Sequence, residues 1–162
     1  MLHLEILHTD ITQMDVDRIV CPIHKDGTPY GETGETTFSA AGYAQLQESI
    51  LADDRLLRVT GFSVPPFQLK AKSLFLLKVL GSSEKDLQQW YHGAFIMSIR
   101  SKDDHNGAVP ILIDTEDVVE AENHWRSLLR WLIRNQKTQN DVEKTLYLVT
   151  RSEWICEIGQ RL

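Results

Sequence analysis

The stretches LEILHTDIT (residues 4–12) and VDRIVCPIH (residues 16–24) decide how this chain folds. Apolar and polar residues alternate from Leu2 to His8, which predicts a half-buried edge strand. The β-branched run from Arg18 to Ile23 predicts a second, more buried strand. Ligands of open α/β sheets bind at the carboxyl ends of strands, so the polar residues that follow these two strands are candidate site residues.

The rest of the chain alternates between apolar runs typical of strands and amphipathic stretches typical of helices. Four more strands are expected, over Leu56–Val64, Ser73–Leu80, Val109–Ile113 and Thr145–Val149. Helices are expected over Thr37–Leu51, Ser83–Ile99, Asp117–Asn135 and Glu153–Leu162, after a glycine-rich loop over Asp26–Thr37. Six strands interleaved with four helices predict a three-layer α/β/α fold with a mostly parallel central sheet.

The 162 residues have the size and composition of one domain, spanning residues 1–162. A net charge of −6 and a pI near 5.5 argue against a nucleic-acid partner, which would require a basic surface. No window approaches the roughly 20 apolar residues of a membrane span, and the first residues do not resemble a signal peptide. Cys21 and Cys156 are expected to be free thiols, which indicates a cytoplasmic protein.

Four short motifs resemble the macro domain, the ADP-ribose-binding module. Thr9-Asp10-Ile11-Thr12 resembles that family's Gly-Asp-Ile-Thr, and residues 16–20 are similar to its Val-Asp-Ala-Ile-Val. Ala40-Ala41-Gly42 matches an Ala-Ala-Gly in the family's first helix, and Leu69-Lys70-Ala71-Lys72 resembles its Leu-Pro-Ala-Lys. The resemblance spans nearly the whole chain in order and spacing. It implies the macro-domain form of the α/β/α fold and a small nucleotide-like ligand.

The departures from the family lie in the ligand loops. Cys21-Pro22-Ile23-His24 replaces Asn-Ala-Ala-Asn, so His24 stands where the resemblance places an Asn that holds the distal ribose. Tyr30-Gly31-Glu32 or Gly31-Glu32-Thr33 replaces Gly-Gly-Gly, and Asp114-Thr115-Glu116-Asp117 replaces the second glycine-rich loop. Glycine-rich loops bind phosphate through backbone N–H groups. Acidic side chains repel it instead, by roughly 4 kcal/mol per like-charge pair at an intermediate dielectric. We therefore expect normal recognition of the ADP-ribose diphosphate to be lost.

Two candidate residues near the first strands have both a functional and a structural interpretation. Asp10 could accept a hydrogen bond from an adenine amino group, as the resemblance implies, or it could cap the turn before Thr12. Cys21 and His24 could form a nucleophile–base pair or two metal ligands. The alternative is a buried strand cysteine beside a hydrogen-bonded loop histidine, and we favour it because a metal site needs further ligands.

The acidic loops are open to the same two interpretations. Thr36 or Thr37 could cap the first helix and leave its N-terminus as an anion site, but Glu32 and Glu35 would then occupy that positive end. The segment from Asp114 to Asp117 could bind a cation or supply an acid and a base. Alternatively, Asp114 or Thr115 could cap the helix that follows, which is the interpretation we favour.

These observations predict a divergent macro-domain-like protein that binds a nucleotide or nucleoside without normal diphosphate recognition. No cofactor and no metal site are predicted, and the ligand-binding residues are expected to be Asp10, Ile11, His24, Gly31, Glu32, Asp114, Thr115 and Glu116. One alternative is a non-catalytic interaction module that meets a protein partner, or a second copy of itself, through the acidic loops or Pro65-Pro66-Phe67. An atypical ADP-ribosyl hydrolase that uses His24 and an acidic loop is ranked last.

Overall fold

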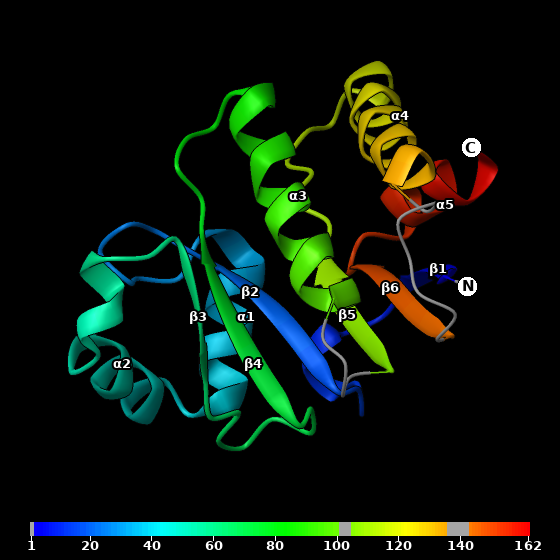
Figure 1. Ribbon diagram of the computed structural model, residues 1–162. Helices are drawn as coiled ribbons and strands as arrows, with labels where there is room; N and C mark the ends of the chain where they lie inside the picture. Colours follow the sequence, from blue (N-terminus) through cyan, green and yellow to red (C-terminus); the bar gives the residue numbers. More distant parts are fainter. Residues whose placement is uncertain (1, 101–104, 136–142) are drawn as a thin grey trace.

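The computed structural model describes residues 2–100, 105–135 and 143–162, which contain a six-stranded mixed sheet in the order β1-β6-β5-β2-β4-β3 (Figure 1). The strands are β1 (Leu2–His8), β2 (Arg18–Ile23), β3 (Gly61–Val64), β4 (Ser73–Lys78), β5 (Asn106–Pro110) and β6 (Lys144–Thr150). The strands pair in parallel except at one edge, where β3 runs antiparallel to β4. The predicted mostly parallel sheet, with β1 at an edge, is confirmed.

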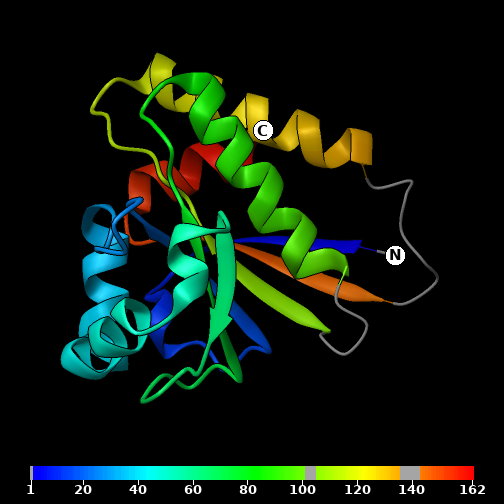
Figure 2. The ribbon, with the colours of Figure 1, turned by 60° about the vertical axis from the view of Figure 1, so that its left-hand side comes forward.

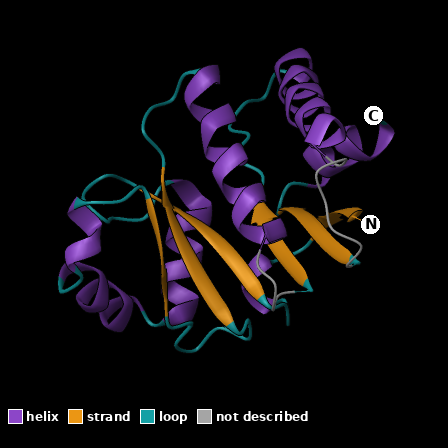
Figure 3. Cartoon of the chain, in the orientation of Figure 1, coloured by secondary structure: helices purple, strands orange, loops and turns teal. Residues whose placement is uncertain are grey.

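Helices cover both faces of the sheet, which gives the predicted three layers (Figures 2 and 3). They are α1 (Gly31–Ala41), α2 (Tyr43–Leu51), α3 (Glu84–Arg100), α4 (Val118–Asn135) and α5 (Glu153–Arg161), with short 3-10 helices η1 (Ile11–Gln13) and η2 (Asp54–Leu57). The helices α1 and α2 pack on one face, and α3, α4 and α5 lie on the other. None of the described helices is both long and apolar enough to cross a membrane.

Each face of the sheet has its own apolar core. Phe38 of α1 and Leu46 of α2 are fully buried against one face, while Phe95 of α3 and Trp125 of α4 are fully buried on the other. Burial of such side chains stabilises the fold by about 1.5–3 kcal/mol each. The Trp125 indole also donates to the carbonyl of Ile155 at 2.9 Å, which fastens α4 to α5.

The first helical segment differs from the prediction. The predicted loop over Asp26–Thr37 contains the start of α1 at Gly31, and Gly42 divides the predicted helix over Thr37–Leu51 into α1 and α2. Gly42 has a φ of +107°, a conformation that L side chains rarely adopt. Gly34 looks like a loop residue in sequence, but a Cβ there would lie 2.9 Å from the carbonyl oxygen of Pro22. Close packing against the end of β2 therefore selects Gly34, whereas the positive φ selects Gly42.

Two predicted strands are displaced. Leu56–Val64 was expected to be one strand, but η2 occupies its first residues and β3 begins only at Gly61. The strand expected over Val109–Ile113 is β5, which ends at Pro110. The apolar residues Ile111–Ile113 therefore leave the sheet and line the cavities described below.

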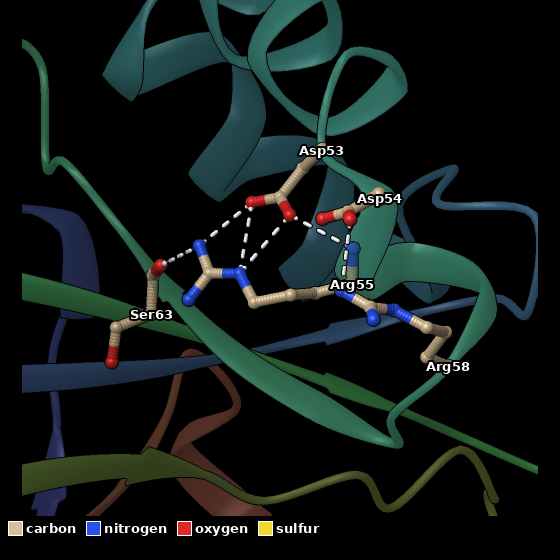
Figure 4. Close-up of polar contacts among 5 residues, drawn as sticks. All are labelled: Asp53, Asp54, Arg55, Arg58 and Ser63. Atoms are coloured by element: carbon tan, nitrogen blue, oxygen red, sulfur yellow. Dashed lines mark hydrogen bonds and ion pairs between the residues drawn. The ribbon is translucent and has the colours of Figure 1, made fainter.

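A polar cluster joins η2 to the edge strand β3 (Figure 4). Asp53 caps η2 by accepting from the Arg55 N–H at 3.0 Å, and the Arg55 guanidinium binds the same carboxylate at 2.7 Å. Arg55 also donates to the carbonyl of Ser63 in β3 at 3.0 Å. The hydrogen bonds from Arg55 hold the pKa of Asp53 at about 2, below its ordinary value. The cluster ties η2 to the outer edge strand of the sheet.

Candidate functional site

A cleft of about 380 Å³ opens where the parallel strands β1, β5 and β6 end, beside the start of α1. Thr9 and Ile11 follow β1, the segment from Ile111 to Asp114 follows β5, and Arg151 follows β6. The parallel arrangement brings these three loops to one edge of the sheet, which is where ligands bind in open α/β folds. We call this the strand-end cleft.

The N-terminus of α1 forms one wall of the strand-end cleft. Tyr30 is its N-cap residue and makes no side-chain capping hydrogen bond. The first backbone N–H groups of a helix have no partner within the helix, and they carry a partial positive charge. Gly31 has a φ of +63°, which glycine adopts without strain, and a Cβ added there would meet no atom within 4 Å. Thr36 and Thr37 lie inside α1, so their predicted capping role is wrong.

Arg151 supplies a cationic side chain to the strand-end cleft. Its Nη1 atom donates to the hydroxyl of Thr36 at 3.2 Å and lies 3.9 Å from the Glu32 carboxylate. Both Arg151 and Glu32 are mostly exposed, so this ion pair contributes little to stability and can rearrange around a ligand. The positive end of α1 is therefore balanced by Glu32 and reinforced by Arg151.

The acidic loop after β5 presents less negative charge to the strand-end cleft than its sequence suggests. Asp117 caps α4 by accepting from the N–H groups of Val119 at 2.8 Å and Glu120 at 3.2 Å. Thr115 accepts from the Asp117 N–H at 3.1 Å and donates to the Glu120 carboxylate at 2.6 Å. A residue of this segment does cap α4, as predicted, but the capping residue is Asp117 and not Asp114 or Thr115. Of the four residues in this segment, Asp114 lines the cleft.

No protein-family model and no curated protein sequence matches the chain, but solved structures do. A mutant Oceanobacillus iheyensis macrodomain with ADPR matches with a TM-score of 0.78 and 20% identity, over 98% of this chain and 90% of that one. The Trypanosoma brucei macrodomain in complex with ADP matches with a TM-score of 0.74 and 13% identity, over 98% of this chain and 68% of that one. The macro domain of ganglioside induced differentiation associated protein 2 matches with a TM-score of 0.68 and 16% identity, over 99% of this chain and 82% of that one. The chain has the macrodomain fold.

This macrodomain fold confirms the predicted architecture and places several predicted site residues together. Ile11, Gly31, Glu32 and Asp114 line the strand-end cleft. Thr115 lines a larger cavity, described below, and His24 lines a shallow surface depression. Neither Asp10 nor Glu116 lines the strand-end cleft or either of these two cavities. Asp10 caps η1 instead, with its Oδ1 accepting from the backbone N–H of Thr12 at 3.0 Å and from its hydroxyl at 2.7 Å.

Cys21 and His24 do not form a nucleophile–base pair in this macrodomain fold. Cys21 is fully buried in the core beneath α1, and burial raises the pKa of its thiol to about 12. The His24 side chain is exposed, with its ring centroid 5.1 Å from that of Tyr30. A thiol that stays protonated inside the core cannot act as a nucleophile. Among the described residues there is also no group of three or more His, Cys, Asp or Glu side chains that could hold a metal ion.

A larger cavity of about 760 Å³ lies between α3 and α4, and we call it the α3–α4 cavity. It shares Tyr30 and residues 112–114 with the strand-end cleft. Tyr91 and His124 meet in its wall at 2.6 Å, and the Tyr91 hydroxyl accepts from the Leu112 N–H at 2.7 Å. Burial lowers the pKa of His124 to about 4.

The sequence-based reasoning missed Arg151, Tyr91 and His124. Arg151 lies two residues after the predicted strand Thr145–Val149, so the rule that placed Asp114 at a strand end could also have found it. Tyr91 and His124 gave no such signal, because they lie on separate helices and meet only through packing of α3 against α4.

Proposed function

We propose that this chain binds a small nucleotide-like ligand, a nucleoside or nucleotide, in the strand-end cleft. The observation that carries the proposal is a cleft at the ends of β1, β5 and β6 that combines the N-terminus of α1 with the guanidinium of Arg151. Two solved structures of the same fold, from Trypanosoma brucei and Oceanobacillus iheyensis, contain ADP and ADPR. Their fold supports the choice of ligand class.

The charges in the strand-end cleft favour a ligand with little phosphate. Its lining contains one guanidinium, that of Arg151, and two carboxylates, those of Glu32 and Asp114. A single phosphate can lie between Arg151 and the first turn of α1, but a second one would approach Asp114, which disfavours it. The volume of 380 Å³ is at the small end of the range for ligand pockets. We therefore propose that the nucleoside and at most one phosphate are recognised, without the usual diphosphate contacts.

Calorimetric titration of the purified chain with adenosine, AMP, ADP and ADP-ribose tests this function. We expect AMP to bind at least as tightly as ADP-ribose, because the second phosphate and distal ribose gain no favourable charge contact. Arg151→Gln should weaken AMP about tenfold and leave adenosine unchanged, since charge-assisted hydrogen bonds contribute about 1.5–3 kcal/mol when well buried and less when exposed. Arg161→Gln is the matched control, because Arg161 is an exposed arginine of α5 that pairs with Glu157.

Two results would contradict the proposal. If a folded sample releases no heat with any of these four compounds, the nucleotide-binding function is wrong. If ADP-ribose binds a hundredfold more tightly than AMP, diphosphate recognition is retained in spite of Glu32 and Asp114.

The hydrolase alternative has weaker support. His24 is exposed, and Cys21, the nucleophile considered for it in the sequence, is buried in the core. Turnover of an ADP-ribosylated protein that disappears in His24→Ala would nevertheless establish it. Without turnover at a high concentration of the folded chain, that alternative is excluded.

A further inference from the structure

The α3–α4 cavity contains a hydrogen-bond donor whose position is fixed by a chain of hydrogen bonds. The Tyr91 oxygen already accepts from the Leu112 N–H, so the Tyr91 hydroxyl hydrogen is available for His124 Nε2, 2.6 Å away. His124 is then a neutral imidazole with its hydrogen on Nδ1. Among the described residues no acceptor is bonded to Nδ1, and His124 belongs to the cavity lining. An acceptor on a ligand can complete this chain.

Two arginines of α4 line the same cavity without carboxylate partners. Arg130 and Arg134 are four residues apart on one face of the helix, and no described carboxylate lies within 4 Å of either. Arg126 on the same helix, by contrast, pairs with Glu122 at 3.6 Å. A planar guanidinium presents a fork of N–H donors that matches a carboxylate. The arginines therefore favour an anionic group at this part of the cavity.

The other residues that line the α3–α4 cavity provide an apolar wall for a ligand and restrict the negative charge that the ligand can carry. Leu87, Leu128 and Trp131 supply apolar surface, and the Trp131 ring is held by its contacts with the rings of His92 and Phe95. The carboxylates of Glu84, Asp114 and Glu120 also line the cavity, none of them within 4 Å of Arg130 or Arg134. They repel a second negative charge, so a singly charged ligand is favoured over a nucleotide with several phosphate charges.

We propose that the α3–α4 cavity is a second binding site, next to the strand-end cleft, for a small organic monoanion that carries a carboxylate on a flat apolar body. The carboxylate binds Arg130 and Arg134, a ligand oxygen accepts from His124 Nδ1–H, and the flat body packs against Trp131 and Leu128. This site does not depend on the nucleotide-binding function proposed above.

Titration of the full chain with 1-naphthoate tests the second site, with 1-naphthamide as its uncharged analogue. We follow binding by calorimetry and by the indole N–H resonance of Trp131, assigned with Trp131→Phe. Naphthoate should bind at least tenfold more tightly than naphthamide and shift the Trp131 resonance. Arg130→Gln should weaken naphthoate about tenfold, whereas the control Arg126→Gln on the same helix should not change it. Ser127→Phe should abolish binding by filling the cavity, while AMP binding remains unchanged.

Three outcomes would overturn the second site. The first is no binding of naphthoate at millimolar concentration to a chain that is folded by circular dichroism. The second is equal affinity in the Arg130→Gln and Arg126→Gln variants. The third is displacement of naphthoate by AMP, which would place it in the strand-end cleft.

Discussion

Replacement of His124 by Gln should make the unfolding free energy of the chain less sensitive to acid. His124 is neutral in the folded chain, where burial lowers its pKa from 6.5 to about 4. Above pH 6.5 both the folded and the unfolded chain hold it neutral, and its contribution to stability is fully present. As the pH falls from 6.5 through 4, the unfolded chain takes up the proton first, so stability is lost over this window.

The magnitude follows from the two pKa values. Each pKa unit corresponds to about 1.4 kcal/mol, so the loss attributable to His124 is about 2 kcal/mol at pH 5, about 3 kcal/mol at pH 4, and approaches about 3.4 kcal/mol at lower pH. Glutamine removes the titration but keeps an amide oxygen that can accept from Tyr91. The loss of unfolding free energy between pH 8 and pH 5 should therefore be about 2 kcal/mol smaller in His124→Gln than in the unaltered chain.

The assay is urea unfolding at a series of pH values, followed by circular dichroism. His3→Gln is the control for the loss of an exposed histidine, because His3 is exposed on β1. An NMR titration of the His124 ring should show its protonation near pH 4 in the folded chain. Equal losses of stability in His124→Gln and the unaltered chain would refute the reasoning, as would protonation of His124 near pH 6.5.

Three further predictions concern stability and are measured by the same urea unfolding. Gly159→Ala should destabilise the chain by about 1–3 kcal/mol, because a Cβ there would lie 2.6 Å from the Trp125 ring; a neutral result would mean that α4 and α5 can separate freely. Asp117→Ala should cost about 1 kcal/mol through loss of the α4 cap, whereas Glu116→Ala should cost less than about 0.5 kcal/mol; equal losses would contradict the assigned cap. The depressed pKa of Asp53 gives a contribution that is present above pH 3.8 and lost as the pH falls toward 2; Asp53→Asn should lose that dependence, and an unchanged acid limb would contradict the Arg55 contact.

Much of the fold was predictable because local pattern and burial agree. The apolar runs of β2 and β4 and the amphipathic pattern of α4 were predicted close to their observed bounds. The errors fall where tertiary packing overrides local signals. Glycine and threonine between residues 31 and 37 favour a loop in isolation, yet packing against Pro22 stabilises α1 there. The apolar residues after Pro110 suggest more strand, but they line the cavities instead.

The strand-end residues could be anticipated from the sequence, but their charges could not be assessed. Asp114 and Asp117 are identical side chains three residues apart, and only hydrogen bonding to the first N–H groups of α4 shows that Asp117 is a cap. Likewise Cys21 and His24 are close in sequence, but one side chain faces the core and the other faces solvent.

The sequence by itself determined the strand order along the chain, the layer architecture and the edge of the sheet where the strand-end cleft lies, because these depend on hydrophobic periodicity and on the direction of parallel strands. The tertiary structure alone decided which polar groups face a cavity. It brought Arg151 to the start of α1 and Tyr91 into contact with His124 across two helices. It also showed that the Asp117 carboxylate is hydrogen-bonded to the first turn of α4 and not directed into the cleft. Contacts between residues distant in sequence depend on how helices pack, and a single sequence does not record that packing.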